Sequence, residues 1–341
     1  VQNGVAAGWM TALLMQSGQA RAGGSGGGND WDRQVSGASM PTSTAANKAV
    51  QDAYDAARRA YSEENFDEAI RLYGIIIDLD PDSFVWYERR GQVLVDANRF
   101  KEALESFNKA VELTPPNYKS VGLLANRGLA HEGLYQWNEA LDDYNEAIDI
   151  GKSIGNKYPY ILNSRGNVYS SLGRWEEARN DYLQSAAIFQ ESRMLSATIF
   201  AAGNAALVSA QLGDDETAVR ELKAQARRGS ASIDFRAAIA ALEWKNGNEQ
   251  QAIKTWNSAC KNIRSGQLKP GGPTYDSCGD FTDATWLLKI RRWPPRMVEL
   301  MQQFLEGMPL MDDEEIYSVP ADASPRAKLT QSLKKSGYVA T

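Results

Sequence analysis

A short phrase recurs along this chain and limits what the chain can fold into. Each copy has an aromatic residue, a Glu-Ala pair that starts two residues later, and a second aromatic four residues after the alanine. The alanines of the four clear copies are separated by 34, 37 and 38 residues. Two weaker copies follow, and a period near 34 is typical of stacked helical hairpins. The sequence therefore predicts an all-α solenoid of about six helix pairs, whose repeat alanines are Ala69, Ala103, Ala140, Ala178, Ala218 and Ala252.

Small residues and turn residues fit this arrangement. A small side chain where two helices cross allows them to approach closely. The first helices of the four clear copies supply such residues at Ala57, Gly91, Gly128 and Gly166. Residues that tolerate left-handed backbone are expected at the turn inside a pair. These are Asn98, Gly173, Gly213 and Gly247.

The second copy resembles the tetratricopeptide-repeat (TPR) family most clearly. Its matching residues are Tyr87, Gly91, Phe100, Ala103, Phe107, Ala110 and Pro115. The resemblance extends over residues 50–262 and weakens in the fifth copy, which has Ala206 and Leu222 where glycine and an aromatic are usual. It implies a solenoid that holds another protein and needs no cofactor.

The resemblance also implies where a partner binds. In TPR arrays the first helix of each pair lines a concave groove, which accepts an extended peptide or a helix. The corresponding positions in this chain are Tyr54, Arg58, Tyr61, Glu88, Gln92, Glu132, Tyr160, Asn163, Asn167, Ser170, Phe200 and Leu207. A known TPR mode grips the C-terminal carboxylate of chaperones with lysines, an arginine and asparagines at set positions. Tyr54, Arg58, Arg89, Gly122 and Asn126 stand there, so we do not expect a chaperone-tail adaptor.

The residues after the repeats predict a helical cap. The segment around Arg291-Arg292-Trp293-Pro294-Pro295 resembles the ending of TPR proteins from cyanobacteria and plastids. We expect a linker and cap over residues 263–306, covering the outer face of the sixth pair, and a flexible tail over 307–341. Lys289, Arg291, Arg292 and Arg296 form a basic cluster, for which capping is a better interpretation than nucleic-acid binding.

The beginning of the chain has a different composition. Residues 5–15 form an apolar run that is too short to span a bilayer, and Ala20-Arg21-Ala22 resembles a signal-peptidase site. Residues 1–22 are therefore interpreted as a cleavable targeting segment and residues 23–49 as a flexible linker. The alternative is a disordered tail with a chance apolar run. With the plastid resemblance, the first interpretation predicts a chloroplast protein of the thylakoid lumen, the alternative being the stroma or another soluble compartment.

Composition excludes several classes of function. The net charge of −6 argues against nucleic acid as the main partner. The single histidine, His131, leaves little scope for metal sites or acid–base catalysis, and we expect it to be packed and hydrogen-bonded. Fewer than about 80 residues follow the repeats, too few for most catalytic domains. We therefore expect a non-catalytic scaffold that serves the assembly or maintenance of a photosynthetic membrane complex. The alternatives are a permanent structural subunit of a large complex and an accessory TPR region of an enzyme.

Two further patterns make structural predictions. Arg90, Arg127 and Arg165 each precede a close-contact glycine, and we expect them to pair with acidic residues of a neighbouring helix rather than to form an anion-binding ladder. The two cysteines, Cys260 and Cys278, are 18 residues apart. A disulfide between them would stabilise the cap by about 3 kcal/mol in the chain-entropy model. Free thiols, the default in a reducing compartment, remain the alternative.

Overall fold

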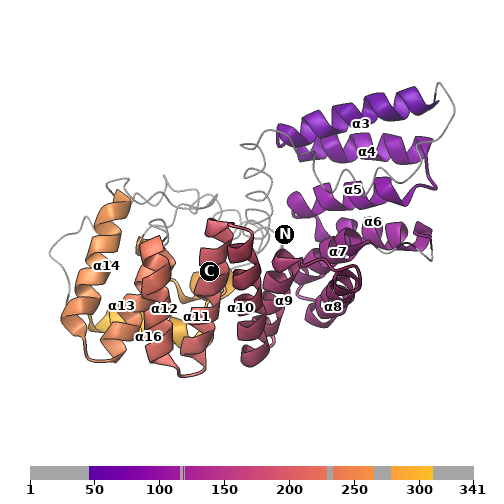
Figure 1. The fold of residues 1–341 in the computed structure, drawn as a ribbon. Coiled ribbons are helices and arrows are strands. Elements are labelled where there is room, and N and C mark those ends of the chain that lie inside the picture. Colours follow the sequence, from indigo (N-terminus) through magenta and orange to yellow (C-terminus); the bar gives the residue numbers. More distant parts are fainter. Residues whose placement is uncertain (1–45, 116–117, 119, 229–232, 265–277, 310–341) are drawn as a thin grey trace. The chain divides into compact units, whose positions relative to one another are not determined.

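The computed structural model describes residues 46–115, 118, 120–228, 233–264 and 278–309. These residues form six successive helix pairs followed by a 3₁₀ helix and two α-helices (Figure 1). The pairs are α3 (Ala46–Ser62) with α4 (Phe66–Leu79), α5 (Phe84–Asp96) with α6 (Phe100–Leu113), α7 (Val121–Gly133) with α8 (Trp137–Ser153), α9 (Pro159–Ser171) with α10 (Trp175–Glu191), α11 (Leu195–Gln211) with α12 (Asp215–Arg228), and α13 (Ile233–Lys245) with α14 (Glu249–Arg264). No strand occurs within the described ranges, so the predicted all-α solenoid is confirmed.

Contacts divide the described residues into two units. The N-terminal unit contains α3–α8 and the C-terminal unit contains α9–α16. Each unit has its own apolar core, formed where the two helices of a pair pack on each other and on the next pair. Among the described residues no helix combines the length and the apolar character that crossing a membrane requires.

The close-contact glycines have a specific packing role. Gly91, Gly128 and Gly166 each face an aromatic ring of the second helix of their own pair. A Cβ atom built on these glycines would lie 2.5, 2.7 and 2.8 Å from the rings of Phe107, Tyr144 and Tyr182. The sequence phrase therefore links two distant positions: the aromatic four residues after the alanine fills the space that the missing side chain leaves.

The first aromatic of the phrase connects successive pairs. Phe100 opens α6 and is buried, and its ring lies against Gly133 at the end of α7. A Cβ atom on Gly133 would approach that ring to 2.6 Å. Packing between neighbouring pairs, rather than within a pair alone, completes the core, as expected for a solenoid.

The turn inside each pair uses one left-handed residue. The predicted positions Asn98, Gly173, Gly213 and Gly247 have φ values of 60°, 72°, 89° and 79°. Glu64 and Tyr135 adopt the same conformation, with φ of 58° and 60°, in the first and third pairs. All six residues stand two positions before the first residue of the second helix.

The cap contains a 3₁₀ helix, η1 (Cys278–Thr282), a short helix α15 (Ala284–Lys289) and a longer helix α16 (Pro295–Gly307). Asp283 caps α15 by accepting a hydrogen bond from the Trp286 N–H at 3.0 Å. Pro295 is the first residue of α16, where its missing N–H costs nothing. The predicted targeting segment, the linker up to residue 45 and the tail from residue 310 lie outside the described residues.

Candidate functional site

The candidate site is the face of the first helices that carries the predicted groove positions, and we call it the groove face. The N-terminal unit carries it on α3, α5 and α7, and the C-terminal unit carries it on α9, α11 and α13. Groove residues are assigned by the repeat register: equivalent positions in different pairs are separated by the same number of residues from the close-contact small residue of their own helix.

On α3 the groove face is aromatic and basic. The half-buried ring of Tyr54 lies between Tyr73 and Trp86, with centroids 6.5 and 5.5 Å away. Arg58 is exposed, and its guanidinium carbon lies 5.8 Å from the centre of the Tyr54 ring. A guanidinium held near a ring loses less freedom when it binds a partner. The Arg58 guanidinium is thus exposed to solvent and rests on the packed ring of Tyr54.

A hydrogen bond connects the groove faces of α3 and α5. The Tyr61 hydroxyl donates to the Asp96 carboxylate at 2.7 Å. Burial raises the pKa of Asp96 from its ordinary 3.8 to about 6, and the hydrogen bond from Tyr61 offsets part of that effect. Burial, followed by the charge of Asp96, raises the pKa of Tyr61. Asp96 is not among the predicted groove residues. It directly follows Val95, which occupies on α5 the groove position that Tyr61 occupies on α3.

Replacing Asp96 by asparagine is expected to remove part of the pH dependence of stability. Because its pKa is higher in the folded chain, the stability linked to its protonation is fully present below about pH 4 and is lost as the pH rises through about 6. Between pH 4 and pH 7.5 the wild-type chain should lose about 2–3 kcal/mol more than Asp96→Asn. Urea unfolding of both proteins at the two pH values measures this difference, and equal pH dependence would contradict the assignment.

Other predicted groove residues of the N-terminal unit are less accessible. Gln92 is half-buried, whereas Glu88 is only 9% exposed. Burial raises the pKa of Glu88, against the opposing effects of Arg89 and a hydrogen bond with Ser120. Glu132 is fully buried and accepts a 2.7 Å hydrogen bond from the Tyr144 hydroxyl. A partner could not touch Glu132 without a rearrangement of α7 and α8.

Two of the three repeated arginines behave as predicted. Arg127 binds the buried Asp143 of α8, with its Nε 2.9 Å from Oδ2. Arg165 binds Asp181 of α10 through two hydrogen bonds of 2.7 and 2.8 Å. The position that pairs with Arg90 is Ser106, 16 residues later as in the other two pairs, so Arg90 has no carboxylate there. Arg127 and Arg165 each connect the two helices of one pair, so they do not form an anion-binding ladder.

His131 lies beside the ion pair of Arg127 and Asp143. Its Nδ1 is 2.7 Å from Gln136 Oε1, and its Nε2 is 3.8 Å from Asp143 Oδ2. Its side chain is 15% exposed. The predicted packed and hydrogen-bonded histidine is therefore confirmed. Within the described ranges no group of three or more His, Cys, Asp or Glu residues could hold a metal ion.

The groove face of α9 is polar and partly open. Tyr160 packs on Phe189 with ring centroids 4.7 Å apart. The Tyr182 hydroxyl donates to Asn167 at 2.7 Å and lies 3.4 Å from the Ser170 hydroxyl. Asn167 and Ser170 are half-buried. Asn163, by contrast, is 7% exposed.

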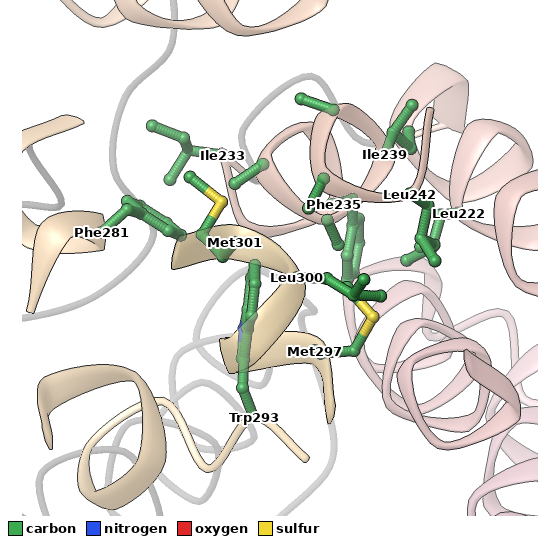
Figure 2. Packing of buried hydrophobic residues seen from close by; sticks show 14 of the residues in the cluster. Leu222, Ile233, Phe235, Ile239, Leu242, Phe281, Trp293, Met297, Leu300 and Met301 are labelled. Carbon is green, nitrogen blue, oxygen red and sulfur yellow. The ribbon is translucent and has the colours of Figure 1, made fainter. Parts of the chain in front are cut away.

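The groove face of α11 and α13 is covered by the chain itself. Helix α16 packs on α13 and α11, and Leu207 is 5% exposed in the shared apolar cluster. Figure 2 shows Met297, Leu300 and Met301 pointing from α16 toward α13. Phe200 is half-buried. The cap therefore lies on the groove face of the fifth and sixth pairs and also against Trp256 of α14, whereas the prediction named the outer face of the sixth pair alone.

Two arginines of the basic cluster attach the cap. Arg291 is 5% exposed at its side chain and binds Asp234 of α13, with Nε 2.7 Å from Oδ1. Arg296 makes a bidentate pair with Asp215 at 2.6 and 2.9 Å and also donates to the carbonyl oxygen of Ala210. These contacts support the capping interpretation of the cluster. They also explain why the cap selects this face: Asp234 lies on it, and Asp215 follows α11 at the start of α12.

The cysteines lie where the cap begins. Cys260 of α14 and Cys278 of η1 are joined by a disulfide, with their Cα atoms 5.7 Å apart. Both residues are buried, at 2% and 5% exposure. The ring of Phe281 lies close by, 5.9 Å from Trp256 of α14. The bond thus fixes the start of the cap segment to the sixth pair.

Comparison with known proteins identifies the repeat. Residues 54–118 and 160–192 match models of the tetratricopeptide repeat. A FAM10 family protein from Arabidopsis thaliana is 34% identical over 94 residues, and the Hsp70-Hsp90 organizing protein of Triticum aestivum is 33% identical over 107 residues. These matches cover 28% and 29% of this chain but 21% and 18% of the relatives, so the chain spans about a fifth of their length.

A solved structure extends the similarity in fold. A tetratricopeptide repeat protein from Parabacteroides merdae is 14% identical, with a TM-score of 0.53, and the match covers 79% of this chain and 98% of that one. At this identity the match concerns the fold alone, and it agrees with the six helix pairs. The described chain is a helical solenoid of the tetratricopeptide-repeat type, with the repeat itself recognised at residues 54–118 and 160–192.

Proposed function

We propose that this chain is a non-catalytic scaffold that binds another protein on the groove face of its first helices. TPR solenoids bind peptides and helices on their concave surfaces. The observation that carries the proposal is the contrast between the two ends of the described chain. The groove face of α3 and α5 keeps Arg58 exposed and Tyr54 and Gln92 half-exposed, whereas that of α11 and α13 is covered.

The chemistry of the open face indicates the kind of segment it takes. The face combines aromatic rings, the exposed Arg58 guanidinium and the Gln92 amide, with the Tyr61–Asp96 hydrogen bond between them. Such a surface offers hydrogen bonds and ring contacts to an extended peptide or one face of a helix. It lacks the lysine and asparagine set that grips a chaperone carboxylate, so the proposed partner is not a chaperone tail. The name of the Hsp70-Hsp90 organizing protein describes that relative, and we do not transfer its role to this chain.

The proposed setting is the assembly or maintenance of a photosynthetic membrane complex in the thylakoid lumen. Three features support this setting. The residues around Trp293 resemble endings of plastid and cyanobacterial TPR proteins, and the segment up to Ala22 resembles a cleavable signal. A disulfide between Cys260 and Cys278 persists best in an oxidising compartment.

The double variant Arg58→Ala/Gln92→Ala is expected to lose partner binding at least tenfold, because both side chains are accessible on the open groove face. The full chain would be immobilised and exposed to an extract of photosynthetic membranes, and captured proteins quantified by mass spectrometry. Arg71→Ala is the matched control, since Arg71 is an exposed arginine on the second helix α4 that forms an ion pair with Glu68 of its own helix.

The two parts of the proposal fail in different ways. If the double variant captures the same proteins as the wild type and the control, the groove face is not the binding surface. If capture depends on Arg58 and Gln92 but the captured proteins are unrelated to photosynthetic complexes, the scaffold function stands and the setting is wrong.

A further inference from the structure

The cap occupies groove positions of two successive repeats. Asp234 and Trp244 of α13 are the register equivalents of Phe200 and Ala210 of α11, in each case 34 residues later. Arg291 binds Asp234, and the ring of Phe304 lies 5.6 Å from the ring of Trp244. On α11, Arg296 donates to the Ala210 carbonyl oxygen and its backbone N–H donates to Gln211. The cap therefore takes the place that the repeat register assigns to a partner.

The shape of this surface suits a helix. Four of the groove positions on α11 and α13 carry glycine or alanine, whereas Phe200, Leu207 and Trp244 at other groove positions are bulky. These small residues are Gly203, Ala210, Ala237 and Ala241, and all four are buried in the described chain. The ring of Phe235 fills the space beside Gly203, and the three alanines leave a shallow trough in which a helix can approach closely. The helix seated on it is the independent observation that this trough accepts one.

The seated helix shows what the trough recognises. Met297, Met301 and Phe304 of α16 are fully buried and follow the i, i+4, i+7 spacing of a groove-bound amphipathic helix. Just before them, Arg296 pairs with Asp215, which also binds Lys245 at 2.6 Å. Burial favours the neutral form of Asp215, but the hydrogen bonds from Arg296 and Lys245 outweigh it and lower the pKa of Asp215, which keeps the carboxylate charged opposite Arg296. Apolar residues at this spacing, preceded by an arginine, are the recognised pattern.

Among the described contacts, the disulfide is the covalent element that holds the segment near its trough. Without it, the covalent connection between the cap and α14 would be the main chain between residues 264 and 278. In the chain-entropy model a bond closing a loop of this length favours the closed arrangement by about a hundredfold. Loss of the bond therefore raises the fraction of molecules with a free trough by up to about a hundredfold.

We propose that the groove face of α11 and α13 is a second protein-binding site, specific for an amphipathic helix of a partner, and that residues 278–309 occupy it while the Cys260–Cys278 bond is intact. The inference rests on the groove-face function proposed above and adds its regulation. Reduction by a dithiol breaks the S–S bond: the two cysteines receive two electrons and two protons, and the dithiol becomes a disulfide. The released segment can then be exchanged for a partner helix of the same pattern.

Hydrogen exchange of the full-length chain tests the release. In Cys260→Ser/Cys278→Ser, and in reduced wild type, the amides of α16 and α13 should exchange at least tenfold faster than in oxidised wild type. The amides of α9 and α10 should be unchanged, because they lie outside the trough. Leu288→Ser is the matched control: Leu288 belongs to the same segment but is 43% exposed, so its replacement should leave α16 protected.

Peptide binding tests the site. A fluorescein-labelled peptide of residues 291–309 should bind the double cysteine variant at least tenfold more tightly than oxidised wild type. The same peptide with alanine in place of Phe304 should bind at least tenfold more weakly. Unchanged exchange in α16, equally faster exchange throughout the C-terminal unit, or peptide binding that ignores the redox state would each overturn the proposal. None of these results depends on Arg58 or Gln92, so failure here is separable from failure of the proposed function.

Discussion

Replacing Asp234 by alanine is expected to destabilise the C-terminal unit by about 3–5 kcal/mol, because it leaves a buried cation without its partner. Arg291 is 5% exposed at its side chain, and Asp234 is 9% exposed. Burial lowers the pKa of Arg291 to about 9, so the guanidinium is still charged at pH 7 and must remain solvated or paired. Urea unfolding at pH 7, followed by tryptophan fluorescence, measures the loss.

Two further variants show whether the pair or the site causes the effect. Glu249→Ala removes an exposed carboxylate from the first turn of α14 and should cost no more than about 0.5 kcal/mol. Asp234→Leu/Arg291→Met replaces the pair by apolar side chains and should recover most of the loss, as found when buried ion pairs are replaced together. If Asp234→Ala is as mild as Glu249→Ala, the ion pair does not hold the cap.

The repeat made the fold predictable, because one periodic phrase specifies both helices of a pair. The phrase places an aromatic opposite each close-contact glycine, and the structure brings Phe107 to Gly91 as that spacing requires. Glu64 and Tyr135 were not predicted to be left-handed, since their residue types give no such signal. The signal lay in the register: Glu64 and Tyr135 occupy the position of Asn98, where every turn needs a positive φ.

The groove face was predictable in position but not in accessibility. Register alone placed Tyr54 and Arg58 on the partly exposed groove face, yet it also selected Glu132, which Tyr144 holds inside the core. A helical period tells which side chains share a face, and neighbouring elements decide whether solvent reaches that face. A carboxylate four residues after a close-contact glycine, with a tyrosine 12 residues later, is a pattern that could have indicated the internal hydrogen bond.

The position of the cap on the groove face was not predicted, for a related reason. The apolar content of residues 282–306 shows that the segment must be buried, but hydrophobicity does not specify which surface receives it. The charges do. Asp215 and Asp234 are acidic residues at the starts of α12 and α13, and both are buried with an arginine of the cap. Asp234 holds a groove position of α13, and Asp215 opens α12 directly after the turn from α11, so matching the cap's arginines to these two carboxylates would have pointed to the groove face.

Replacing Trp256 by alanine should have an effect as large as that of Asp234→Ala, about 3–5 kcal/mol, through packing rather than charge. Trp256 is fully buried in α14, and its ring lies 5.9 Å from Phe281 and 6.1 Å from Phe304. It therefore supports both the first and the last part of the cap. Thermal unfolding of the oxidised protein should show a lower Tm, with the amides of α16 exposed first.

Trp256→Phe is a matched control because the Trp256 Nε1 atom has no hydrogen-bond partner in the described chain. The change removes volume without removing a hydrogen bond, so it should cost clearly less than Trp256→Ala. The two variants separate a fixed cap from an exchangeable one. In an exchangeable cap, Trp256→Ala accelerates hydrogen exchange in α16 well before the helices α9 and α10 respond. If exchange instead rises equally in α9, α10 and α16, the cap and the last repeats unfold as one unit, and α16 is a permanent part of the core rather than an occupant of a binding site.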